Sequence, residues 1–167
     1  MRCERCPRVI CNPLLQANRI VKRFLDAIND CDHKDLEIKL PTAEELHEIA
    51  EGWNKSSTAG GSMNGCVLAI DGFLSPRIRP NVEHPYDYFT DRKSIYCLIV
   101  IAAIDHLGRF RYFAVSAPGK SNDVRSYWRC KSLREFIERL RDIRLGRYFG
   151  TADNAFPLSN ELLIPFR

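Results

Sequence analysis

The stretch Gly65-Cys-Val-Leu-Ala-Ile-Asp-Gly72 sets the expected fold. Its apolar run, Cys66 to Ile70, is too short for a convincing helix and contains β-branched side chains, which predicts a strand buried on both faces. Asp71 follows directly, so we expect its carboxylate at the rim of a sheet, half removed from water, where it can hold a metal ion. Asp-Gly pairs also open turns, and this segment alone leaves both roles open for Asp71.

Length and composition indicate one domain with a hydrophobic core, because the chain has 167 residues of which 45% are hydrophobic. The longest apolar run, Cys97 to Ile104, covers 8 residues, whereas a membrane-spanning helix needs about 20. Arg2, Glu4 and Arg8 interrupt any signal-peptide pattern at the start. We therefore expect an intracellular protein in which the seven cysteines are reduced thiols.

Charge is unevenly distributed along the chain, although the net charge is only +4. The segment from Asp26 to Glu51 has nine acids and two bases, and the segment from Arg109 to Arg147 has eleven bases and four acids. The positive second half suits contact with a polyanion, but solvated helix faces produce similar counts.

Residues 1–62 are expected to form a helical accessory segment ahead of the sheet. Apolar residues at spacings of three and four predict a helix over Pro13 to Asp30, with the proline in its first turn. A second helix is expected to start at Thr42, which has Glu45 three residues later in the pattern of a capping box.

The N-terminal cysteines raise the possibility of a zinc site. Cys3 and Cys6 have the spacing of a first ligand pair. Cys31 and His33 are too closely spaced for the usual second pair, so free thiols are the favoured interpretation.

The region after Asp71 predicts an alternation of strands and helices. In chain order we expect an irregular loop over 73–91, an antiparallel hairpin of strands Ser94–Ile104 and Arg109–Ser116, a helix capped by Ser121 or Asn122, a helix over Ser132–Arg144, and a short strand over Tyr148–Ala152 that ends at Asp153.

This order is that of an RNase H-like, or retroviral integrase-like, α/β fold in residues 63–167, with a mixed sheet and flanking helices. In such a sheet the first and fourth strands lie side by side, which would bring Asp71 and Asp153 together. Two carboxylates with a third group can hold two divalent ions roughly 4 Å apart that activate the attacking oxygen and stabilise the leaving oxygen of a phosphodiester. Carboxylate oxygens are also the ligands that Mg²⁺ prefers.

Several motifs then match one family in order and spacing. They are Ala69-Ile70-Asp71-Gly72, a Tyr-rich loop leading to Arg92-Lys93, Asp105-His106-x-Gly108-Arg109-Phe110, Pro118-Gly119-x-Ser121-x-Asp123, and Asp153-x-Ala155-Phe156-Pro157-Leu158 with Leu163-Ile164-Pro165-Phe166-Arg167. From about Leu40 to Arg167 the chain resembles the PIF/Harbinger-type DDE transposases and their domesticated relatives.

The resemblance implies a DDE endonuclease or transposase that cuts DNA with a divalent metal cation, Mg²⁺ or Mn²⁺. Asp71 and Asp153 would be catalytic acids, and Asp71, Asp123 and Asp153 would be metal ligands. Asp123 also fits an acid at a helix N-terminus, and Asp153 an acid in a turn. The family further implies a nuclear location and a Myb-like DNA-binding partner protein.

The candidate DNA contacts are basic residues, several of which lie among tyrosines and phenylalanines. This mixture suits a phosphate backbone and exposed bases, and a proline-rich loop anchored by its aromatic residues is the alternative. The candidate nucleic-acid-binding residues are Arg77, Arg79, Arg92, Lys93, Lys120 and Arg125.

The chain departs from the family in ways that affect chemistry. Phe73-Leu74 replaces the usual Thr-His pair, and Ala152 replaces the usual Gly. The family's third catalytic acid, a Glu on a helix a few dozen residues past the second acid, has no counterpart, because the sequence ends fourteen residues after Asp153. Glu161 lies in the wrong part of the pattern, so we expect a core truncated at its C-terminus. The alternative to a metal-dependent nuclease is therefore a catalytically inactive domesticated or fragmentary derivative that binds DNA or a protein partner.

Overall fold

The computed structural model describes residues 22–23, 26, 38–57, 63–143 and 147–165. The chain divides into two compact units, Met1–Glu37 and Ile38–Arg167. In the first unit only Lys22, Arg23 and Asp26 are described, and all three are helical and exposed. The remainder of the expected Pro13–Asp30 helix, and the four candidate zinc ligands, lie outside the described residues.

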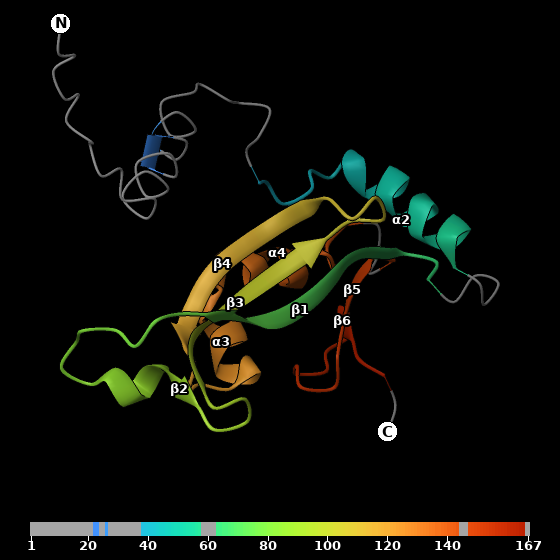
Figure 1. The fold of residues 1–167 in the computed structure, drawn as a ribbon. Helices are drawn as coiled ribbons and strands as arrows, with labels where there is room; N and C mark the ends of the chain where they lie inside the picture. The colour runs from blue at the N-terminus through green and yellow to red at the C-terminus, as the bar shows by residue number, and fades with distance from the viewer. Residues whose placement is uncertain (1–21, 24–25, 27–37, 58–62, 144–146, 166–167) are drawn as a thin grey trace, which may run out of the picture. The chain divides into compact units, whose positions relative to one another are not determined.

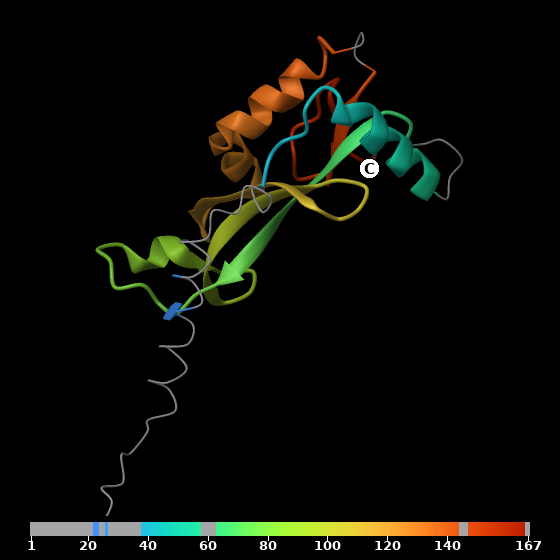
Figure 2. The ribbon, with the colours of Figure 1, turned by 90° about the horizontal axis from the view of Figure 1, so that it is seen from above.

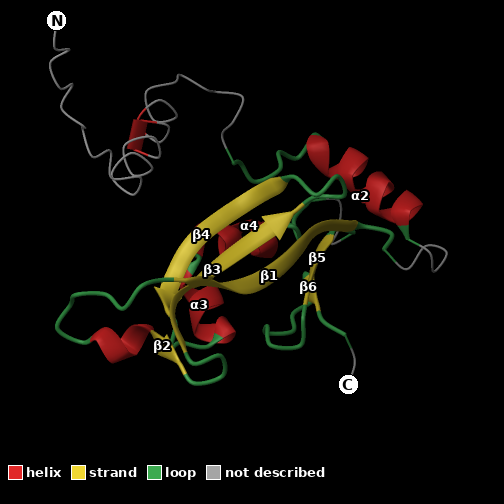
Figure 3. Cartoon of the chain, viewed as in Figure 1, coloured by secondary structure: helices red, strands yellow, loops and turns green. Residues whose placement is uncertain are grey.

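Six strands form a mixed sheet in the described part of the second unit (Figures 1 and 3). Their bounds are β1 Cys66–Pro76, β2 Phe89–Thr90, β3 Ile95–Ile104, β4 Phe110–Pro118, β5 Phe149–Ala152 and β6 Leu162–Leu163. The order is β2-β3-β1-β5-β6, and β4 pairs with β3. β3 is antiparallel to β1, β2 and β4, whereas β5 is parallel to β1 and to β6. The predicted mixed α/β class is therefore confirmed.

Three α-helices and one 3-10 helix accompany the sheet among the described residues. They are α2 Glu45–Ser56, η2 Pro85–Tyr88, α3 Asp123–Arg129 and α4 Lys131–Arg139. α2 buries Leu46, Ile49 and Ala50 in the same core as the strands. No helix in the described ranges is both long enough and apolar enough to cross a membrane.

Helices α2 and α4 both pack against the sheet and contribute to the same hydrophobic core. Tyr112 of β4 interacts with Ser132 of α4, whereas the adjacent Arg111 donates a 2.7 Å hydrogen bond to Glu45 of α2. Figure 2 shows α4 along one side of the sheet. Its packing is close, because a Cβ on Gly150 of β5 would lie 3.0 Å from Cδ1 of Ile137.

β1 is longer than the sequence predicted. It pairs with β3 without interruption from Ala69 to Pro76, so Asp71 lies within the strand, opposite Ala102, rather than at its end. The predicted irregular loop was therefore wrong for Phe73 to Pro76. The continuous hydrogen-bonded pairing with β3 outweighs the local turn tendency of Asp-Gly.

The predicted hairpin of β3 and β4 is confirmed. Asp105 is fully buried at its turn and accepts hydrogen bonds from the backbone N–H groups of Leu107 and Arg109 at 3.0 and 3.1 Å. The left-handed φ of 74° at the turn occurs at Gly108, where glycine has no steric penalty. The hairpin thus holds β3 in place between β1 and β4.

Helix ends follow the predicted caps only in part. Asn122 caps α3 by accepting a 2.8 Å hydrogen bond from the Arg125 backbone N–H, as predicted. At α2, the Thr42 backbone N–H donates to the Glu45 carboxylate at 2.8 Å, which is one half of the expected capping box. α4 ends at Arg139, earlier than predicted. β2, η2 and β6 were not predicted.

Glu161 has a structural role instead of a catalytic one. It is 4% exposed, and Nε of Arg141 donates a 2.8 Å hydrogen bond to its carboxylate. The Ser159 hydroxyl also contacts the carboxylate, at 3.4 Å. These contacts hold the segment that leads into β6, and they pair the carboxylate with an arginine inside the fold.

The Glu161 ion pair predicts a pH-dependent stability. The hydrogen bond from Arg141 lowers the pKa of Glu161, so the ionised carboxylate stabilises the folded state. That contribution is complete above the unfolded pKa, about 4.3, and is lost as pH falls through the lower folded pKa. We expect Glu161→Gln to lower the melting temperature at pH 7 and to lower it much less near the folded pKa. Thermal unfolding followed by circular dichroism measures the difference.

The control for this pH series is Glu135→Gln, because Glu135 is exposed and pairs only at 3.6 Å with exposed Lys131. A melting-temperature difference for Glu161→Gln that stays constant between neutral and acid pH would contradict the assigned role of the ion pair.

Candidate metal and nucleic-acid site

Asp71 and Asp153 are neighbours across two parallel strands. In the pairing of β1 with β5, Ile70 lies opposite Ala152, and each acid is the next residue along its own chain segment. Adjacent strands lie about 4.8 Å apart. Both acids are exposed. The sequence prediction that these strands are adjacent is therefore confirmed, and the two carboxylates come from the same level of the sheet.

One local hydrogen bond restrains each carboxylate and leaves its other oxygen free to accept a ligand. One oxygen of Asp71 accepts from the Gly72 backbone N–H at 2.7 Å, and one oxygen of Asp153 accepts from the Ala155 backbone N–H at 3.0 Å. The turn after Asp153 is anchored by Phe156, which is 4% exposed and has its ring 5.6 Å from that of Tyr127. Each acid therefore keeps oxygen lone pairs available to a ligand.

Asp123 shares the electrostatic environment of these two acids. It is the first residue of α3 and is half-buried. Burial raises its pKa above the ordinary value, the positive charge of Arg92 opposes that rise, and the negative charges of Asp153 and Asp71 add to it. Arg92, Asp71 and Asp153 are thus close enough to Asp123 for their charges to act on it.

The three aspartates do not form a ready-made three-ligand site. Among the described residues there is no group of three or more His, Cys, Asp or Glu side chains that could hold a metal ion. Oδ1 of Asp123 lies 3.1 Å from where a Cβ on Gly72 would be, and Gly72 and Asp71 face opposite sides of β1 by strand alternation. The structure brings Asp71 and Asp153 together, and a metal role for Asp123 stays a prediction.

The candidate DNA-binding side chains are all exposed. Arg79 stacks over the ring of Tyr86 at 5.5 Å from its centre, so aromatic and basic groups do interleave in this loop. The Lys120 backbone N–H donates a 3.0 Å hydrogen bond to the Asp87 carbonyl, which ties the loop before α3 to η2. The exposed basic residues are Arg77, Arg79, Arg92, Lys93, Lys120 and Arg125.

The positive excess of the second half is partly neutralised within the fold. Arg109 pairs with buried Asp105 at 2.8 Å, and Arg111 pairs with Glu45 at 2.7 Å. Arg141 pairs with Glu161. Counting charges along the sequence therefore overstates the charge that this half presents to a polyanion.

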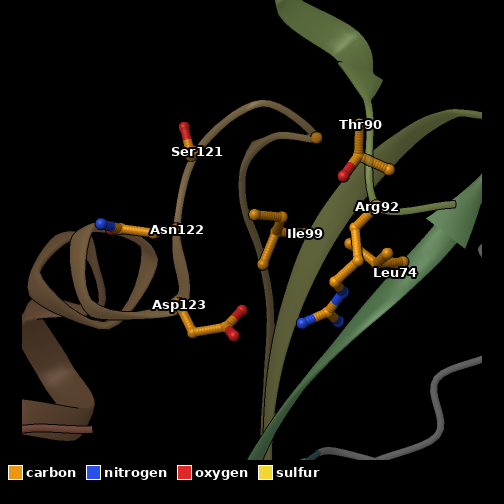
Figure 4. A pocket seen from close by; sticks show the side chains of 8 residues that line it. Leu74, Thr90, Arg92, Ile99, Ser121, Asn122 and Asp123 are labelled. Carbon is orange, nitrogen blue, oxygen red and sulfur yellow. The ribbon is translucent and has the colours of Figure 1, made fainter. Parts of the chain in front are cut away.

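A small pocket beside Asp123 was not predicted. It has a volume of about 200 Å³ and lies between the loop after β2 and the loop before α3 (Figure 4). Its lining combines two apolar side chains with hydroxyl, amide and charged groups. The lining residues are Leu74, Thr90, Arg92, Ile99, Gly119, Ser121, Asn122 and Asp123.

Comparison of the chain with protein-family models, with curated proteins and with solved structures finds no match in any of the three.

Proposed function

We propose that the sheet unit is an RNase H-like core that binds a divalent cation on Asp71 and Asp153 and acts on the phosphodiester bonds of DNA. The observation that carries this proposal is the parallel pairing of β1 with β5, in which Ile70 opposite Ala152 is followed on both strands by an aspartate. The strand arrangement supports it, since the antiparallel strands β1, β3 and β4 are followed by β5, which is parallel to β1.

The two aspartates fit the requirements of Mg²⁺ or Mn²⁺. Such ions take hard oxygen ligands, and Mg²⁺ is commonly held by one or two carboxylates together with substrate phosphate oxygens and water. Asp71 and Asp153 supply two exposed carboxylates from adjacent positions, and each hydrogen bond to a backbone N–H restrains the side chain. When bound, the cation would polarise the phosphate and lower the pKa of the attacking water.

The remaining residues of the site would hold the DNA strand. Arg92 lies close enough for its charge to act on Asp123, so it can contact a phosphate near the acids. Lys93 follows it directly and is exposed. A nuclear location and a Myb-like partner stay predictions from the family resemblance.

DNA binding without cleavage is the second candidate function. It is favoured by one observation, namely that no third acidic side chain completes a metal cluster within the described residues. Loss of one acid would weaken the second metal site and slow a reaction in which two ions act together.

A nicking assay on supercoiled plasmid DNA separates the two candidates. The nuclease proposal predicts relaxed DNA in the presence of Mn²⁺ and none with a chelator. Retardation of DNA that is independent of metal, without nicking at any metal concentration, would overturn cleavage and support the binding function.

DNA affinity is expected to fall steeply with salt, because the proposed contacts are mainly to phosphates. Each phosphate contact contributes roughly −0.9 to the slope of log K against log salt concentration. Lys93→Gln should therefore reduce the magnitude of that slope by about 1. Fluorescence anisotropy of labelled DNA over a salt series measures it.

Lys131→Gln is the matched control, because Lys131 is also exposed but pairs with Glu135 on α4. Its slope should equal that of the wild type. Affinity that does not change between low and physiological salt would contradict phosphate-based binding.

A further inference from the structure

The pocket beside α3 carries opposite charges on its two walls. Figure 4 shows the Arg92 guanidinium and the Asp123 carboxylate extending toward one another from opposite sides of the cavity. Leu74 of β1 and Ile99 of β3 contribute the apolar part of the lining. The hydroxyl groups of Thr90 and Ser121 belong to the same lining.

The two charged groups do not satisfy each other. No ion pair within 4 Å joins Arg92 to Asp123, and neither side chain forms a hydrogen bond with another described residue. Gly119 keeps the wall before α3 close to β3, since its backbone N–H donates a 2.9 Å hydrogen bond to the Cys97 carbonyl. A ligand with an acceptor edge toward Arg92 and a donor edge toward Asp123 would satisfy both groups at once.

Guanine has this combination of edges. Its O6 and N7 are adjacent acceptors that a guanidinium binds in a bidentate manner. Its N1–H and 2-amino group are adjacent donors, and a carboxylate has two acceptor oxygens and no donor. Adenine and thymine have no two adjacent acceptors on one edge and no two adjacent donor groups on another, and cytosine has the adjacent acceptors N3 and O2 but only one donor group, its 4-amino group. None of them therefore pairs with both Arg92 and Asp123 through two hydrogen bonds each.

The size of the pocket fits a single base. Its volume of about 200 Å³ is below the roughly 300–1,000 Å³ of pockets for drug-sized ligands. Leu74 and Ile99 provide an apolar surface for the face of the ring. A base inside a duplex cannot enter such a cavity, so the occupant would be unpaired or rotated out of the stack.

We propose that the pocket between Arg92 and Asp123 binds one unpaired guanine base of the DNA strand. Arg92 donates to O6 and N7, and Asp123 accepts from N1–H and the 2-amino group. This inference rests on the proposed function for the identity of the polymer, and it adds to it a means of choosing the base next to Asp71 and Asp153.

The test is the affinity of the intact chain for short thymidine oligonucleotides that carry one modified position, measured by fluorescence anisotropy with a chelator present. An oligonucleotide with guanine should bind about tenfold more tightly than one with adenine, since a good bidentate pair is worth about 1–3 kcal/mol. Hypoxanthine lacks the 2-amino donor, and 7-deazaguanine lacks the N7 acceptor. Each should bind several-fold more weakly than guanine.

Two variants show which side chain, Arg92 or Asp123, is responsible for each loss of affinity. Asp123→Asn should abolish the difference between guanine and hypoxanthine, and Arg92→Gln should abolish the difference between guanine and 7-deazaguanine. Asp142→Asn and Arg139→Gln are matched controls, because both residues are exposed and lie outside the pocket lining. Both controls should keep the full guanine preference.

Equal affinity of the wild-type chain for the guanine, adenine and hypoxanthine oligonucleotides would overturn the proposal, and this comparison needs no variant to fold. Binding that requires Mn²⁺ and ignores the base would also overturn it, because the pocket would then hold a cation with a phosphate. The chelator separates this test from cleavage. Guanine preference without plasmid nicking supports the pocket and rejects the nuclease, whereas nicking without guanine preference rejects the pocket alone.

Discussion

Asp71→Asn and Asp153→Asn are each expected to reduce plasmid nicking by on the order of 10³-fold or more, because loss of one carboxylate weakens binding of the cation that activates the attacking water. Asparagine keeps the size of the side chain. Its oxygen can still accept the backbone hydrogen bond that Gly72 or Ala155 donates. The loss should therefore reflect charge and metal binding rather than misfolding, and thermal unfolding can confirm that stability is kept.

The double variant distinguishes a shared ion from two independent acids. If both carboxylates hold one cation, the double variant should be no less active than either single variant, because residues that act as a unit are strongly non-additive. Asp91→Asn is the matched control, since Asp91 is exposed in the turn between β2 and β3. Its nicking rate should equal that of the wild type. Losses that multiply in the double variant would contradict a shared site.

Gly119→Ala is expected to destabilise the fold by about 1–3 kcal/mol, the usual cost of forcing extra atoms into a packed interior. Gly119 is buried. A Cβ there would lie 2.7 Å from the Tyr88 carbonyl oxygen and 2.9 Å from the Cys97 carbonyl oxygen, and it would also collide with the Cys97 thiol. Because two of these neighbours are backbone atoms, relief requires the loop before α3 to move. Urea unfolding followed by circular dichroism measures the change.

Gly108→Ala provides a matched glycine-to-alanine comparison. A Cβ at Gly108 would have no neighbour within 4 Å, so only its left-handed φ of 74° is costly, at about 1–2 kcal/mol. We also expect Gly119→Ala, and not Gly108→Ala, to weaken the guanine preference, because Gly119 lines the pocket. Wild-type stability of Gly119→Ala would contradict the close approach at this position.

The sheet was largely predictable because its strands carry strong local signals. The apolar runs of β1 and β3, the hairpin turn at Asp105 to Gly108, and the Asn122 cap are each encoded within a few residues. The length of β1 was not predictable in this way. Phe73 to Pro76 contains a proline and follows a glycine, so the local signal favours a loop, and only pairing with β3 makes it a strand.

Only one part of the candidate site was predictable from the sequence, namely the adjacency of Asp71 and Asp153. The order of strands and helices along the chain predicts that the strands before these two acids are neighbours in the sheet. The opposition of Arg92 and Asp123 does not follow, because the walls of the pocket come from β1, β3 and two separate loops. The pairing of Arg111 with Glu45 is likewise a long-range contact, which is why charge counting overstated the exposed basic surface.

Binding of Mn²⁺ in the absence of DNA, measured by electron paramagnetic resonance, tests most directly whether Asp71 and Asp153 share a cation. The account predicts one bound ion per chain in the wild type and in Asp142→Asn. It also predicts an affinity at least tenfold weaker in both Asp71→Asn and Asp153→Asn. Equal Mn²⁺ affinity in the wild type and either of these two variants would contradict it.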